Sequence, residues 1–97
     1  MGVRENKVEK YLDTEVKKLG GITRKWVSPG RDGVPDRIVR LHRWEKGVVC
    51  MVEVKTVDGT TSPCQKREQQ RETGAGCWVE TVYGNKGVDN LLKSWVL

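Results

Sequence analysis

Hydrophobic residues in the first quarter of the chain recur at helical spacing. They are three or four residues apart and are followed by a glycine pair: Val8, Leu12, Val16 and Leu19, then Gly20-Gly21. Such spacing gathers apolar side chains on one face of a helix, and glycine commonly stands just past a helix C-terminus. The pattern predicts a first helix that ends at the glycine pair.

The middle of the chain has the alternation and turn residues of three strands. Residues 22–28 precede a Pro-Gly turn, and residues 48–56 are the most β-prone run of the chain. Pro35 cannot donate a hydrogen bond to a ladder, so the second strand is predicted to begin at Asp36. A hairpin turn at residues 45–47 would join it to the third strand. Alternation there places Glu53 and Lys55 on one face.

The last third of the chain predicts a helix, a strand and another helix. Ser62 suits the N-cap, Pro63 the first helical position, and Gln65 completes a capping box. This polar helix is predicted to end near residues 74–76, with a strand over 77–83 and a short helix over 88–96. The order α-β-β-β-α-β-α predicts one α/β domain over residues 1–97, with a small mixed sheet flanked by helices.

Composition narrows the function classes. The chain has 18 Lys and Arg against 13 Asp and Glu, a formal net charge of +5, which favours polyanionic partners because phosphate neutralisation releases counterions. The three cysteines are widely spaced and the single histidine has no companion, which argues against a zinc site or a disulfide framework. The N-terminus lacks a signal-peptide run, and no segment approaches the roughly 20 apolar residues that cross a bilayer. We therefore expect a cytoplasmic protein without membrane contact.

The candidate chemistry lies in three charged residues on two neighbouring strands. Hydrolysis of a phosphodiester is helped by a hard divalent cation, and Mg²⁺ takes one or two carboxylates besides waters and substrate oxygens. Asp36 and Glu53 supply two carboxylates across the predicted hairpin, and Lys55 shares the face of Glu53. A Glu and a Lys in an apolar strand are costly to bury without a functional reason. This pattern predicts a metal-dependent phosphodiester hydrolase.

Purely structural interpretations compete with this prediction. Glu53 and Lys55 could form an exposed ion pair, which is usually worth little, and Asp36 could be a turn residue after proline. The capping box alone explains Gln65. On the first helix, periodicity does not distinguish Glu9 from the two other glutamates of that helix.

Three runs of the sequence resemble the motifs of a known nuclease family. They are Gly33-Val34-Pro35-Asp36-Arg37, Val52-Glu53-Val54-Lys55-Thr56 and Ser62-Pro63-Cys64-Gln65-Lys66. These runs are similar to the motifs of the VRR-NUC family, the virus-type replication–repair nucleases of the PD-(D/E)xK superfamily. The resemblance covers nearly the whole chain. It implies a restriction-endonuclease-like fold with an α-β-β-β-α-β core, here with an extra C-terminal helix.

The resemblance also implies roles for the residues on the strands. Mg²⁺, or Mn²⁺ in its place, would bind Asp36, Glu53 and the backbone carbonyl of Val54. Lys55 would position or activate the attacking water. No small-molecule cofactor is expected.

Further candidate residues lie outside the strands that carry the metal site. The resemblance implies that Glu9 is an additional metal ligand acting through water and that Gln65 supports the site or the substrate. Among the basic residues, Arg31, Arg37 and Lys66 are predicted to contact DNA phosphates. Arg31 is the foremost of these because its loop precedes the Pro-Asp motif.

Compact members of this family resemble Holliday-junction resolvases that form homodimers. We therefore expect a Mg²⁺-dependent, structure-specific DNA endonuclease of a phage or mobile element that cuts branched DNA in repair as a homodimer. The last helix, with Leu91, Leu92 and Trp95, is the candidate dimer surface. Two alternatives remain: a flap-type nuclease of a replication machine, and a catalytically silent module that binds DNA or a replication protein. The intact set of three charged residues argues against the silent module.

Overall fold

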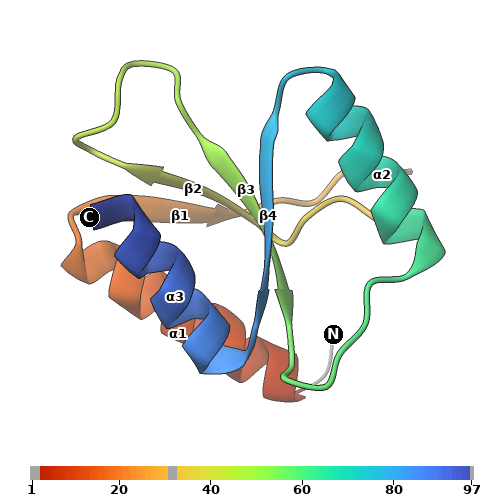
Figure 1. Ribbon diagram of the computed structural model, residues 1–97, viewed down its shortest axis with the longest axis horizontal. Helices are drawn as coiled ribbons and strands as arrows, with labels where there is room; N and C mark the ends of the chain where they lie inside the picture. The colour runs from red at the N-terminus through yellow and green to blue at the C-terminus, as the bar shows by residue number, and fades with distance from the viewer. Residues whose placement is uncertain (1–2, 31–32, 97) are drawn as a thin grey trace.

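The computed structural model describes residues 3–30 and 33–96, with side chains described from residue 6 onward. The described residues form seven elements in the predicted order (Figure 1): α1 (Val3–Lys18), β1 (Gly21–Lys25), β2 (Arg37–Leu41), β3 (Cys50–Lys55), α2 (Pro63–Gly74), β4 (Trp78–Tyr83) and α3 (Gly84–Val96). This arrangement confirms the predicted α/β fold class. Among the described helices, none combines the length and apolar character needed to cross a bilayer.

The bounds of several elements differ from the prediction for physical reasons. β1 ends at Lys25, three residues early, because its register with β2 sets Val27 opposite Pro35, which has no N–H to donate. β3 begins at Cys50, two residues later than predicted. The carbonyl groups of the preceding hairpin accept hydrogen bonds from the Arg40 guanidinium and not from the backbone of a neighbouring strand. α3 begins at Gly84, four residues early, because its first turn is polar and gives no apolar periodicity.

The four strands form one mixed sheet in the order β1-β2-β3-β4. The first two pairings are antiparallel, whereas β3 and β4 run parallel and are joined through α2. Figure 1 shows α1 and α3 side by side on one face of the sheet and α2 on the other. The sheet therefore separates a layer of two helices, α1 and α3, from a layer that contains α2.

The hydrophobic core fills the layer between the sheet and the α1–α3 pair. Its buried members are Val8, Leu12, Val16, Val39, Leu41, Cys50, Val52, Val54, Val82, Val88 and Leu92. Cys50 is a free thiol whose pKa is raised by burial, so it behaves as an apolar core residue. Because alternate β3 residues fill this core, Glu53 and Lys55 must face the opposite layer.

The last helix turns its large apolar residues inward. Leu92 is buried, and Trp95 packs in a cluster with Trp44 and Trp78 in which ring centroids are 5.0 to 5.7 Å apart. Leu91 is half-buried against the same core. These residues thus pack against the core of their own chain, and the dimer surface on this helix stays a prediction.

Candidate active site

The β2–β3 pairing brings the two predicted carboxylates together. Arg37 is registered with Val52, so the residue before it, Asp36, lies opposite Glu53. Side chains of directly opposed residues project to the same face of a sheet. The Asp36 carboxylate oxygen Oδ2 accepts a hydrogen bond from the backbone N–H of Val54 at 2.9 Å. This bond fixes one carboxylate beside the segment that carries the other.

The side-chain amide of Gln65 joins Glu53 to Lys55. Its Nε2 donates to Glu53 Oε2 at 2.8 Å, and its Oε1 accepts from Lys55 Nζ at 2.8 Å. Lys55 Nζ also lies 3.4 Å from Glu53 Oε2. Glu53 is 2% exposed and Lys55 is 8% exposed, so the alternative of a solvent-exposed ion pair is wrong.

The same glutamine completes the N-terminal cap of α2. Its Oε1 accepts the backbone N–H of Ser62 at 2.9 Å, and its own backbone N–H donates to Ser62 Oγ at 3.1 Å. The capping-box interpretation of Gln65 is confirmed, and the same side chain also binds Glu53 and Lys55. Its role in a catalytic site stays a prediction.

A glycine allows the loop before Asp36 to pack against the first turn of α2. Gly33 has a φ of +88°, and a Cβ at this position would lie 2.8 Å from the carbonyl oxygen of Cys64. Any other residue would be strained in this conformation and would also push α2 away. Close packing here sets the distance between the segments that carry Asp36 and Gln65.

Glu9 is buried on α1 and is bound by two cations. Its Oε1 lies 2.9 Å from Arg37 Nε and 3.5 Å from Lys25 Nζ. Burial raises the pKa of Glu9 above its ordinary value, and the Asp36 charge adds to this increase. The charges of Arg37 and Lys25 oppose it without cancelling it.

Arg37 links β2 to α1 and does not reach toward the charged pair. Besides Glu9, its guanidinium binds Asp13 Oδ2 at 3.0 Å, and Asp13 in turn accepts a hydrogen bond from Thr23. Its side chain is 17% exposed. Carboxylates of α1 bind its guanidinium, and the phosphate contact of Arg37 stays a prediction. The sequence feature that matches these ion pairs is the spacing of Glu9 and Asp13, which lie four residues apart on α1.

The remaining candidates have different placements. Lys66 is exposed on α2, and Arg31 lies outside the described residues. Tyr83, which sequence reasoning missed, is registered with Lys55 and is 42% exposed. Its hydroxyl lies 3.4 Å from that of Thr61. Only the parallel β3–β4 pairing places it beside the lysine, and no local pattern predicts that pairing.

The donor set suits Mg²⁺ bound largely by water and substrate. Within the described ranges, no three His, Cys, Asp or Glu side chains gather closely enough to hold a metal ion. Asp36 and Glu53 nevertheless oppose each other, and they and the Val54 carbonyl are hard oxygen donors of the kind Mg²⁺ prefers, with one or two carboxylates per ion. Glu9 is held by cations instead, so its predicted role through water stays a prediction.

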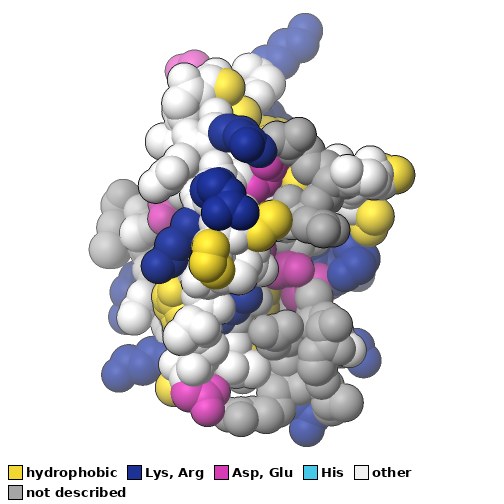
Figure 2. Space-filling view, turned by 90° about the vertical axis from the view of Figure 1, so that its right-hand side faces the viewer, with side chains coloured by type: hydrophobic (Ala, Val, Ile, Leu, Met, Phe, Trp, Pro, Cys, Tyr) yellow, Lys and Arg dark blue, Asp and Glu magenta, His cyan; other side chains and the backbone are white. Residues whose placement is uncertain are grey.

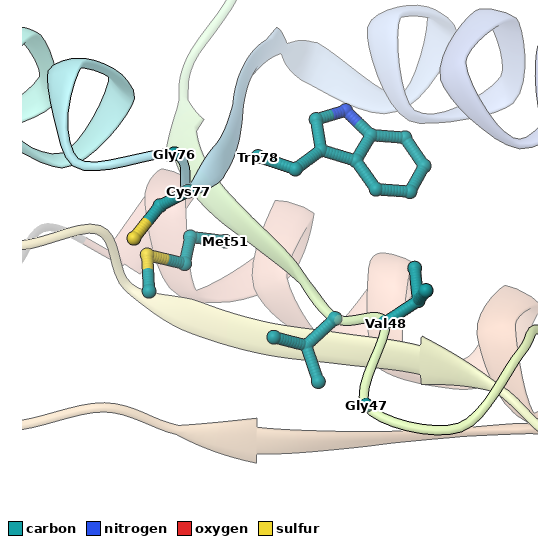
Figure 3. A pocket seen from close by; sticks show the side chains of 7 residues that line it. Gly47, Val48, Met51, Gly76, Cys77 and Trp78 are labelled. Atoms are coloured by element: carbon teal, nitrogen blue, oxygen red, sulfur yellow. The ribbon is translucent and has the colours of Figure 1, made fainter.

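A separate apolar hollow lies at the opposite end of β3 from Lys55 (Figure 3). It encloses about 390 Å³ and is lined by Gly47, Val48, Val49, Met51, Gly76, Cys77 and Trp78. None of these seven lining residues is acidic or basic. The hollow is therefore distinct from the candidate active site and does not supply catalytic groups.

Comparison with known proteins finds relatives of one kind. The chain is 48% identical over 69 residues to "Putative nuclease p44" of Acyrthosiphon pisum secondary endosymbiont phage 1, a span of 71% of each protein. A solved structure described as a VRR_NUC domain superposes with a TM-score of 0.82 at 35% identity, covering 95% of this chain and 97% of that one. A VRR_NUC domain protein with 14% identity shares the fold, with a TM-score of 0.69 over 96% of this chain and 88% of that one. No protein-family model matches the chain.

The charges around Glu9 predict how its pKa should respond to a substitution. In Lys25→Ala, the pKa of Glu9 should rise further, because a positive charge that lowers it is removed. Arg24→Ala is the matched control, since it removes the same charge from the neighbouring exposed position of β1. Carboxyl ¹³C NMR titration measures both. Equal shifts in the two variants would contradict the assigned ion pair.

Proposed function

The chain belongs to the VRR-NUC family of nucleases, and from this we propose that it is a Mg²⁺-dependent endonuclease hydrolysing phosphodiester bonds of DNA. The observation that carries the proposal is the buried bridge from Glu53 through Gln65 to Lys55, opposite Asp36. It places two carboxylates and an ammonium group within one small site. These groups suit the binding of a hard divalent cation and the orientation of a water, which together promote hydrolysis of a phosphodiester.

Metal binding falls to the two opposed carboxylates and the backbone. Asp36, Glu53 and the Val54 carbonyl would hold Mg²⁺, and Mn²⁺ would suit the same oxygen donors. When bound, the ion offsets the negative charge of the phosphate and polarises the attacking water. The hydrogen bond from the Val54 N–H keeps Asp36 aligned for this role.

The hydrogen bonds of Lys55 leave one N–H donor of its ammonium group for the substrate. An ammonium group has three N–H donors. One donates to Gln65 Oε1 and another faces Glu53 Oε2. The third is available to orient the attacking water or to bind a phosphate oxygen.

Burial of the charged pair favours catalysis over a silent binding module. Moving a carboxylate and an ammonium group out of water costs several kcal/mol per ion before their attraction returns part of it. A module that only binds DNA gains nothing from burying Glu53 and Lys55 on the face away from the core. A catalytic site gains fixed geometry.

We further propose that two chains act together on branched DNA. Each chain provides one candidate site, whereas a four-way junction needs two cuts in strands related by a twofold axis. A twofold homodimer would present two sites in that relation. A flap-type nuclease is the second candidate, because a single site suffices for one cut.

Cleavage should depend on both the metal ion and the lysine. Wild-type protein with Mg²⁺ should cut labelled DNA, and EDTA should abolish cutting. Lys55→Ala should reduce the single-turnover rate by about 10²- to 10⁴-fold, the usual contribution of a positioned proton-transfer group. DNA affinity measured in EDTA should change little. Full activity in Lys55→Ala would overturn the assignment of this residue.

Gln65 and Ser62 provide a matched pair within one capping box. Ser62→Ala should cost about 1 kcal/mol of stability through the lost cap and leave the rate nearly unchanged. Gln65→Ala should cost more, roughly 2 to 3 kcal/mol, because it also removes a partner of buried Glu53 and Lys55. It should slow cleavage by about 10- to 100-fold, since this pair loses its common partner. Urea denaturation and single-turnover kinetics separate the two effects. Equal rates in both variants would reduce Gln65 to a helix cap.

The choice of substrate and the oligomeric state test the paired-cut proposal. Four-way junctions should receive symmetric paired cuts, and light scattering should give twice the mass of one chain. Efficient cutting of flaps by a single chain would favour the flap-type candidate. Binding of DNA without cleavage of junction, flap, nicked or plain duplex would favour the silent module.

A further inference from the structure

The solvent-facing charges of α2 are all basic. Lys66, Arg67 and Arg71 are exposed, whereas the two acids of the helix, Glu68 and Glu72, are each 7% exposed. Figure 2 looks at the side of the molecule where α2 lies in Figure 1, and Lys and Arg side chains gather on this face. The outer surface of α2 therefore presents cations among neutral polar groups.

Helix stability does not explain this distribution of charge. Positive charges near a helix N-terminus are unfavourable, because the helix dipole is positive there, yet Lys66 and Arg67 directly follow Gln65 at the beginning of α2. An ion pair joins Arg71 to Glu68 at 3.3 Å, and Arg71 is 63% exposed in its side chain. Such pairs contribute little. A negatively charged partner outside the chain would offset the cost.

The basic residues begin next to the candidate active site along α2. Gln65, which binds Glu53 and Lys55, immediately precedes Lys66 on the same helix. A hollow of about 540 Å³ lies along the helix and is lined by Lys66, Gln69, Gln70, Thr73 and Gly74. These amide, hydroxyl and ammonium groups are of the kind that contact phosphate and sugar oxygens.

The length of this surface sets the size of its ligand. At 1.5 Å per residue, the axis from Gln65 to Thr73 measures about 12 Å. One strand of B-DNA advances about 3.4 Å per nucleotide, so the surface spans roughly three or four nucleotides.

We propose that the outer face of α2 binds the phosphate backbone of the cleaved strand over three or four nucleotides on one side of the scissile phosphate. The inference rests on the proposed nuclease function and adds the path of the substrate to it. Because the contacts go to phosphates, this surface positions DNA without reading its sequence.

A charge-matched pair of double variants tests the proposal. Lys66→Ala with Arg67→Ala removes two cations from α2. Lys17→Ala with Lys93→Ala removes two exposed cations from the last turns of α1 and α3, on the other layer of the sheet. Fluorescence anisotropy in EDTA, over a range of salt concentrations, gives the DNA affinity without cleavage.

The α2 variant should bind DNA about tenfold more weakly than wild type, from the loss of two exposed ion pairs. Its plot of log affinity against log salt should be shallower by about two, whereas the control should match wild type. Equal losses in the two variants, or no loss in either, would overturn the proposal. Mg²⁺-dependent cleavage by wild type would in that case still support the nuclease function.

Substrate length provides a second readout that general electrostatics would not produce. With wild type, cleavage should improve as the strand on one side of the cut is lengthened up to about four nucleotides, and then level off. The α2 variant should lose this dependence, and the control should keep it. The same length dependence in the α2 variant as in wild type would also overturn the proposal. A wild-type chain that neither binds nor cuts DNA would overturn the nuclease function and this inference together.

Discussion

The side-chain amide of Gln65 is the interaction on which the site depends. It donates one hydrogen bond to Glu53 and accepts two, from Lys55 and from the backbone of Ser62. A glutamate would fail because it cannot donate to Glu53, and an asparagine is one methylene shorter. The buried residues of α2, Glu68 and Glu72, are both acidic, so hydrogen bonds such as those of Gln65 matter for the position of this helix. The same hydrogen bonds therefore fix the position of α2 and the arrangement of Glu53 and Lys55.

The sheet divides stability from chemistry. On one face, α1 and α3 enclose the apolar core, and even-numbered β3 residues such as Val52 and Val54 point into it. On the other face, the odd-numbered Glu53 and Lys55 meet a polar helix. Successive side chains of a strand point to opposite faces, so one strand can supply apolar residues to the core and charged residues to the other face. Rigid packing on the first face holds the strand ends that carry the site.

The sequence predicted the features that local rules determine. Helical spacing, turn residues and the capping box gave the order of the elements, and one hairpin register placed Asp36 opposite Glu53. Features that depend on distant contacts escaped prediction. The Arg37 bridge to α1 requires the docking of α1 on β2, and the neighbourhood of Tyr83 and Lys55 requires the parallel β3–β4 pairing. The inward turn of Trp95 requires two partners from elsewhere in the chain.

The negative charge of Asp36 and Glu53 gives the cations on the surface of α2 a role in the proposed site. Two opposed carboxylates repel a DNA backbone at close range, so a metal site of this kind needs cations nearby to admit its substrate. Arg37 is held between Glu9 and Asp13 on the α1 side, and Lys25 lies 3.5 Å from the same Glu9 carboxylate. The exposed cations of α2 begin one residue after Gln65, and the two acids of that helix are buried. In the proposed nuclease, the residue that orders the carboxylates thus also fixes the position of the cations that bring DNA to them.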